Sequence, residues 1–118
     1  KFLDIAIVGL ALNSASVFAA DCTAPAAPEL PDGATASMEQ MLNGQKAVKT
    51  FQTANLEYMA CLEPEMTAAQ TAVDEGAEGA AEKYKELEST YNAAVSAEEE
   101  VAGQFNTEIR EYKAANPS

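Results

Sequence analysis

The chain contains no histidine and no tryptophan among its 118 residues. The lack of histidine removes the side chain most often used as a general base and the commonest protein ligand for metals. Serine and cysteine then have no histidine to activate them, which argues against nucleophilic catalysis. The sequence also contains no glycine-rich phosphate loop and no metal-ligand motif. We therefore expect a protein that is not an enzyme and that uses no cofactor and no metal.

Basic residues are scarce in this chain. It carries 7 Lys and Arg against 19 Asp and Glu, which gives a formal net charge of -12 at pH 7. A nucleic-acid binder needs a basic surface to neutralise phosphates, and docking on an anionic membrane needs clustered Lys and Arg. We therefore expect no nucleic-acid partner and no electrostatic attachment to a membrane. The length of 118 residues allows one small domain.

The longest apolar run is short and lies near the start of the chain. Lys1 precedes apolar residues over 2–12, which Asp4 interrupts, and small residues lead to Ala19. A basic start, a brief apolar core and a small-residue cleavage site make up a secretory signal. We predict a signal peptide over 1–19 that is cleaved after Ala19, with an ordinary amphipathic helix as the alternative. The run is too short for an ordinary transmembrane helix.

Export determines how the two cysteines are interpreted. Asp21 precedes Cys22 where a lipoprotein signal would need a small residue, so we expect a periplasmic or secreted protein with no stable membrane anchoring after signal cleavage. Cys22 and Cys61 are the only cysteines, and an even count after a secretory signal indicates one structural disulfide. The alternative is a redox-active or metal-binding pair, but no C-x-x-C spacing is present.

Prolines gather in the segment 20–36. Pro25, Pro28 and Pro31 each remove a backbone donor and restrict the residue before them, so this segment cannot be helical. We predict an extended strap of polyproline II type, long enough to run back to Cys61. The strap residues expected in the groove between the helices are Ala24, Ala26, Ala27 and Leu30.

Residues 37–118 show a heptad pattern in two halves. Steps of three and four between apolar positions, sustained this long, predict helices packed as a coiled-coil-like pair. Gly76 and Gly79 mark a stop and a turn, which predicts antiparallel helices over 37–74 and 79–115. The fold class expected is all-α: an antiparallel two-helix coiled-coil-like hairpin whose polyproline-type strap is tied by one disulfide.

The predicted seam between the helices has one polar level, where Asn55 meets Glu98. A single polar layer in an apolar seam fixes register at a cost in stability. Glu98 as a functional buried acid is the alternative. The seam positions of the first half are Met41, Gly44, Val48, Phe51, Asn55, Tyr58, Leu62, Met66, Ala69 and Val73. Those of the second half are Ala80, Tyr84, Leu87, Tyr91, Ala94, Glu98, Val101, Phe105, Ile109 and Tyr112.

Three local features complete the prediction for the helices. Ser37, with Gln40 three residues later, predicts an N-terminal capping box. Pro64 either kinks the first helix or divides it, and a kink is favoured because the seam keeps its phase across the proline. Lys46 is expected to lie across the hairpin from Glu108.

Several short segments are spread over most of the mature chain. They are Cys22, Pro31-Asp32-Gly33, Val48-Lys49, Tyr58-Met59-Ala60-Cys61-Leu62, Tyr91-Asn92-Ala93-Ala94-Val95, Glu98-Glu99-Glu100, Phe105-Asn106 and Arg110-Glu111-Tyr112-Lys113. Together these segments resemble a group of small secreted helical-hairpin proteins of proteobacteria with two cysteines and no assigned activity. The resemblance implies an exported, disulfide-linked helical protein and adds no mechanism.

These observations favour a non-enzymatic periplasmic structural or protein-interaction module that acts through a rigid acidic helical hairpin. Its partner would be an unknown protein or a second copy of itself. A holdase-like periplasmic chaperone is the alternative, because methionines offer adaptable apolar contacts; they are Met38, Met41, Met59 and Met66. A small ligand carrier or enzyme that uses Glu98 and neighbouring Tyr91 is the third hypothesis.

Overall fold

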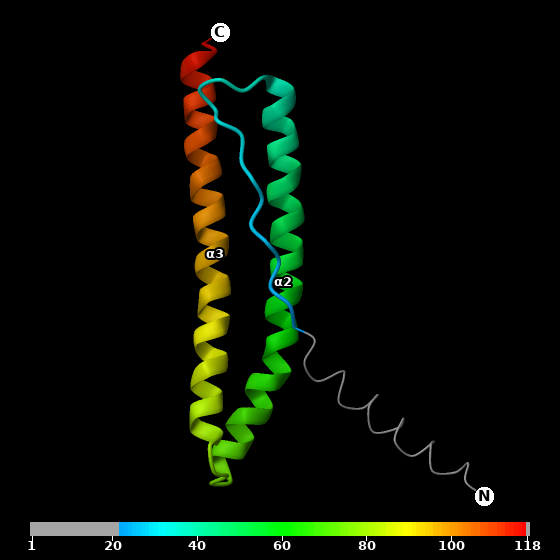
Figure 1. Cartoon of the computed structure of the whole chain (residues 1–118), viewed down its shortest axis with the longest axis vertical. Helices are drawn as coiled ribbons and strands as arrows, with labels where there is room; N and C mark the ends of the chain where they lie inside the picture. The colour runs from blue at the N-terminus through cyan, green and yellow to red at the C-terminus, as the bar shows by residue number, and fades with distance from the viewer. Residues whose placement is uncertain (1–21, 118) are drawn as a thin grey trace, which may run out of the picture.

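The structure is a computed structural model that describes residues 22–117. Two long helices, α2 (Met38–Asp74) and α3 (Ala80–Ala115), run antiparallel beside each other (Figure 1). The predicted all-α hairpin is therefore confirmed. The predicted signal peptide over 1–19 and its cleavage site lie outside the described residues.

Both ends of α2 are capped by hydrogen bonds, at the positions that the sequence indicates. The Ser37 hydroxyl accepts a hydrogen bond from the Gln40 backbone N–H, and the Gln40 side chain accepts one from the Ser37 N–H, so the capping box is confirmed. At the other end, the N–H groups of Gly76 and Ala77 donate to the carbonyls of Val73 and Ala72. This is a Schellman closure, and it needs the positive φ of 77° that Gly76 supplies.

Helix α2 continues through Pro64 without a break. A proline inside a helix cannot donate to the carbonyl four residues earlier and clashes with it, which bends the helix. In Figure 1 the later part of α2 leans toward α3. Pro64 therefore bends a single helix, as favoured, and does not divide it into two.

The seam predicted from the heptad pattern is the interior of the hairpin. Each predicted seam position is buried or half-buried in the structure. One cluster joins Met41, Val48 and Phe51 to Val101 and Phe105 near the open end, where α2 begins and α3 ends. A second cluster packs Leu62 and Ala69 against Leu87 toward the turn, with tyrosines around it. Because both clusters combine residues of the two helices, helix pairing buries the apolar surface of each.

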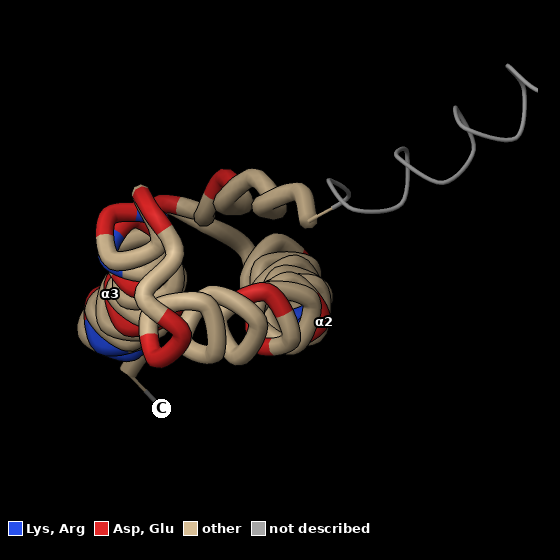
Figure 2. Tube along the Cα trace, turned by 90° about the horizontal axis from the view of Figure 1, so that it is seen from below, with Lys and Arg blue, Asp and Glu red and all other residues tan. Residues whose placement is uncertain are grey.

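A strap, residues 22–36, forms a third layer on one side of the helix pair. The Cys22–Cys61 disulfide, with a Cα–Cα distance of 5.6 Å, ties its start to α2. In Figure 1 the strap runs from the middle of α2 toward the end of α3 and then returns to the start of α2. Figure 2 shows that it lies on one side of the pair.

The prolines of the strap, rather than its alanines, face the helices. Pro25, Pro28 and Pro31 are half-buried like Cys22, whereas Ala24, Ala26 and Ala27 are exposed. The expectation of Ala26 and Ala27 in the groove was therefore wrong, whereas Ala24, although exposed, lines a hollow between the helices, and Leu30 packs on the first cluster. A polyproline II helix has three residues per turn, so the disulfide at Cys22 sets which residue of each turn points inward.

Two glycines let the strap approach both helices closely. A Cβ on Gly44 of α2 would lie 2.7 Å from Pro31 Cδ and 3.1 Å from the Phe105 ring. A Cβ on Gly33 would lie 1.9 Å from the backbone oxygen of Glu108 in α3. The strap thus packs against the backbone of α3 at Gly33 and against α2 at Gly44. At both positions there is no room for a side chain larger than the hydrogen of glycine.

Replacing Gly33 by alanine should lower the free energy of unfolding by about 1–3 kcal/mol, because the clash is with backbone that cannot rotate away. The matched control is Gly103→Ala, since a Cβ at Gly103 meets nothing within 4 Å. That change should raise the free energy of unfolding by about 1 kcal/mol through helix propensity. Chemical denaturation of both variants measures the difference; an unchanged Gly33→Ala protein would refute close seating of the strap.

Candidate functional site

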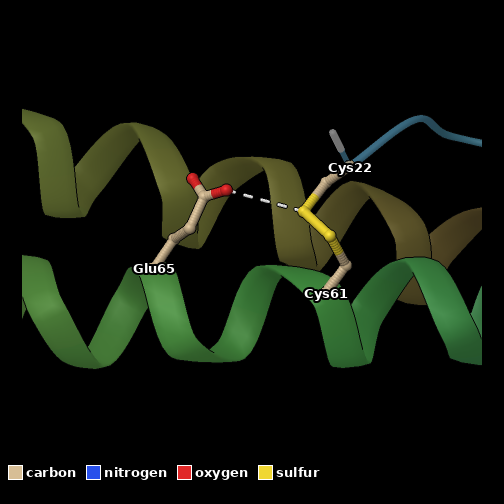
Figure 3. Close-up of a disulfide and its surroundings, with 3 residues drawn as sticks. All are labelled: Cys22, Cys61 and Glu65. Atoms are coloured by element: carbon tan, nitrogen blue, oxygen red, sulfur yellow. Dashed lines mark hydrogen bonds between the residues drawn. A yellow bond between two sulfur atoms is a disulfide. The ribbon is translucent and has the colours of Figure 1, made fainter. Parts of the chain in front are cut away.

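The disulfide lies beside an acidic side chain on α2. The carboxylate Oε2 of Glu65, one turn after Cys61, lies 3.5 Å from the Cys22 sulfur (Figure 3). A sulfur in a disulfide has no proton to donate, so in the oxidised chain this is a contact rather than a hydrogen bond. No free cysteine is present in the described part of the chain. The bridge therefore serves as a fixed link between strap and helix.

Glu108 is the buried acid of the structure, with 9% of its surface exposed. One of its carboxylate oxygens accepts a hydrogen bond of 2.7 Å from the backbone N–H of Gly33, and the other accepts one from the Gln104 amide. These bonds do not test the expectation that Lys46 lies across the hairpin from Glu108. The Glu108 side chain fastens the strap to α3.

Two further acids, Asp32 and Glu111, lie close to Glu108. One carboxylate oxygen from each of the three residues lies within 4.8 Å of the others. The Gly33 N–H holds the pKa of Glu108 below its usual range, whereas the charge of Glu108 raises the pKa of Glu111. Asp32 and Glu111 are exposed. Such an acidic group can attract a cation, but the buried carboxylate already has protein donors, and its evident role is to seat the strap.

Asn55 is the polar residue at the centre of the seam, with only 2% of its surface exposed. Its amide Nδ2 donates a hydrogen bond of 2.9 Å to the backbone carbonyl of Ala94 on α3. Glu98, its predicted partner one turn further along, is only half-buried. The buried polar position was thus foreseen, but the partner is a backbone carbonyl. The alternative of Glu98 as a buried functional acid gains no support from these contacts, since the Tyr91 hydroxyl donates to Glu63.

The seam has two sides, and the strap covers one of them. Gly44, Cys61 and Glu108 hold the strap on that side. We call the opposite side the open side. It consists of the helix positions that flank the seam on the face turned away from the strap. On α2 it consists of Met38, Leu42, Gln45, Lys49, Gln52, Leu56, Met59, Glu63 and Gln70. On α3 it consists of Ala81, Lys85, Glu88, Asn92, Val95, Glu99, Ala102, Asn106 and Lys113.

The open side carries the apolar surface that the fold leaves in water. The large hydrophobic residues that are exposed in the described chain are Met38 at 57%, Leu42 at 52%, Leu56 at 60% and Val95 at 37%. All four belong to the open side. On an acidic surface, exposed apolar residues that gather on one side mark an interaction site more than scattered ones do.

Two hollows lie along the helix pair on this side. One, of about 330 Å³, lies at the open end between Met38 and Leu42 of α2 and Ile109 and Lys113 of α3. The other, of about 500 Å³, lies toward the turn, and Glu63, Met66, Tyr84 and Tyr91 are among its lining residues. The first hollow is apolar with a basic edge, and the second is rich in tyrosine and hydroxyl groups.

Comparisons with protein-family models, with curated proteins and with solved structures found no match to this chain. Within residues 22–117, neither helix has a stretch apolar enough to span a bilayer. What is established is a two-helix protein with one disulfide, and its candidate site is the open side.

Acid should weaken the attachment of the strap through Glu108. Because the folded-state pKa of Glu108 lies below its value in the unfolded chain, its stabilising contribution is present above the ordinary pKa of 4.5 and is lost as pH falls through the folded value. Glu111 has a raised pKa, so its ionisation opposes folding as pH rises.

We therefore expect Glu108→Gln to lower the free energy of unfolding at pH 7. The free energy of unfolding of this variant should also decrease less as the pH falls. Glu111→Gln should raise the free energy of unfolding at pH 7. Urea titrations from pH 7 to pH 3 test both, with exposed Glu100→Gln as the control. Parallel pH profiles for Glu108→Gln and Glu100→Gln would contradict this account.

Proposed function

We propose that this chain is a non-enzymatic protein-interaction module of the periplasm or of the secreted space, and that it binds through the open side of its hairpin. The observation that carries the proposal is the one-sided exposure of large hydrophobic residues. The strap and its disulfide close the other side of the seam, while Met38, Leu42, Leu56 and Val95 stay in water.

The rigidity of the hairpin supports this proposal. A module that is already ordered loses little conformational freedom when it binds. Here a disulfide, a capping box and a glycine closure fix the ends of α2 and the strap before any partner arrives. The surface outside the open side is acidic. Its negative charge binds water and repels other acidic surfaces, which keeps non-specific contacts few.

Site-specific photo-crosslinking in the exporting cell tests the proposal. A photoreactive amino acid at Leu42 or at Leu56 should give a discrete crosslinked species. The matched control is Ala93, which is exposed on the strap side of α3. Equal crosslinking from all three positions, or none from any, would contradict binding through the open side.

A holdase-like chaperone is the second candidate function, and the placement of methionine favours it. Met38 and Met59 lie on the open side, and Met66 lines the hollow toward the turn. Methionine adapts to varied apolar partners. A holdase would suppress light scattering from a thermally unfolding client enzyme, and Leu42→Gln would weaken that suppression. Unchanged scattering at equimolar chain would remove this candidate and leave the interaction module.

A further inference from the structure

The Cys22–Cys61 disulfide is the covalent link between the strap and α2, and both of its cysteines are half-buried. Small thiols of the surrounding solution can therefore reach it. A thiolate opens a disulfide by attacking one sulfur in line with the S–S bond. A mixed disulfide forms, and the other sulfur leaves as a thiolate and takes a proton from water. A second thiolate then attacks the mixed disulfide, which frees the second cysteine and joins the two small thiols as a disulfide.

The Glu65 carboxylate lies on the line of approach to the Cys22 sulfur. Its Oε2 atom is 3.5 Å from that sulfur, and Figure 3 shows it on the side turned away from the Cys61 sulfur. A thiolate that attacks Cys22 and expels Cys61 must arrive from this same side. Because the thiolate and the carboxylate are both negative, they repel each other, and the carboxylate also occupies the space that the thiolate needs.

Attack at the other sulfur meets the same carboxylate at the leaving group. A thiolate that attacks Cys61 expels Cys22, whose sulfur would then carry a negative charge beside Glu65. A like charge at this distance disfavours the thiolate form, and a poorly stabilised leaving thiolate slows the exchange. Glu65 therefore opposes both routes by which a thiol can open the bridge.

The helix, rather than the strap, places Glu65 beside the bridge. Glu65 follows Cys61 by four residues on α2, so the two side chains lie on one face of the helix, one turn apart. The Glu65 side chain is half-buried. Glu57 precedes Cys61 by the same four residues and is exposed, so it offers the same charge, one turn away on the other side, for comparison.

We propose that Glu65 protects the Cys22–Cys61 disulfide from thiol–disulfide exchange and so keeps the strap tied to α2 where thiols are present. The charge of Glu65 acts on the reaction at both sulfurs, while its own atoms take no part in bond making or bond breaking. The inference concerns the strap side of the hairpin, so it goes beyond the proposed function and does not depend on what binds the open side.

Rates of reduction by thiols of different charge test this inference. The oxidised chain is treated with 2-mercaptoethanesulfonate, whose thiolate form carries two negative charges, or with cysteamine, whose ammonium group offsets its thiolate. Alkylation and mass analysis count the freed cysteines, and each rate is divided by the thiolate concentration. Glu65→Gln keeps the shape of the side chain and removes its charge. It should raise the rate with the sulfonate by about tenfold and the rate with cysteamine by less.

The ratio of the cysteamine rate to the sulfonate rate separates charge from a change in stability. Faster opening of a destabilised fold would raise both rates equally and leave the ratio unchanged. The ratio should fall in Glu65→Gln and fall further in Glu65→Lys, which attracts the sulfonate thiol. Glu57→Gln is the matched control and should change the ratio by less than about twofold, because solvent screens its exposed charge.

Two results would overturn the proposal. One is a ratio in Glu65→Gln equal to that of the unaltered chain, and the other is an equal fall in Glu57→Gln and Glu65→Gln. Either result would show that the carboxylate beside the bridge has no special effect on its exchange, whatever photo-crosslinking finds for the open side.

Discussion

The strap held at both ends is the constraint on which the rest of the structure depends. Two helices alone bury little apolar surface per residue, and so small a core supplies limited stability. The disulfide at Cys61 fixes one end of the strap, and the Gly33 bond to Glu108 fixes the other. Between them the prolines pack along the seam. Because the strap covers only one side, the same constraint leaves the opposite side of the hairpin available for binding.

Charge and shape on the two sides reflect this division. On the strap side, a buried carboxylate is satisfied by backbone and amide donors, and it organises two exposed acids around it. On the open side, acidic and basic residues are balanced and large apolar residues are exposed. A surface with balanced charge and exposed apolar groups suits association with a protein, whereas the acidic remainder suits solvation.

The local parts of the fold could be predicted from the sequence. Helix limits, the capping box, the turn at Gly76 and the seam follow from residues close in sequence, whose spacing alone determines which face is buried. Three features could not. The strap's inward face depends on the phase set by a distant disulfide, the partner of Asn55 is a backbone carbonyl, and Glu108 bonds a glycine far away in the chain. A seam pattern encodes apolar positions but not backbone acceptors. One feature of the sequence did indicate that Glu108 is buried, because it follows Val101 and Phe105 at helical spacing. A charged residue at such a position is nevertheless normally expected at the surface.

Amide hydrogen exchange at Gly33 tests the seated strap most directly. Its N–H is buried and bonded to Glu108, so the account predicts that it exchanges only through global unfolding, with the same opening free energy as Phe51 and Phe105. The neighbouring Ala34 amide, which is exposed, should exchange much faster. Rapid exchange at Gly33, while both helices stay protected, would show that the strap is not held against α3 and would contradict the account.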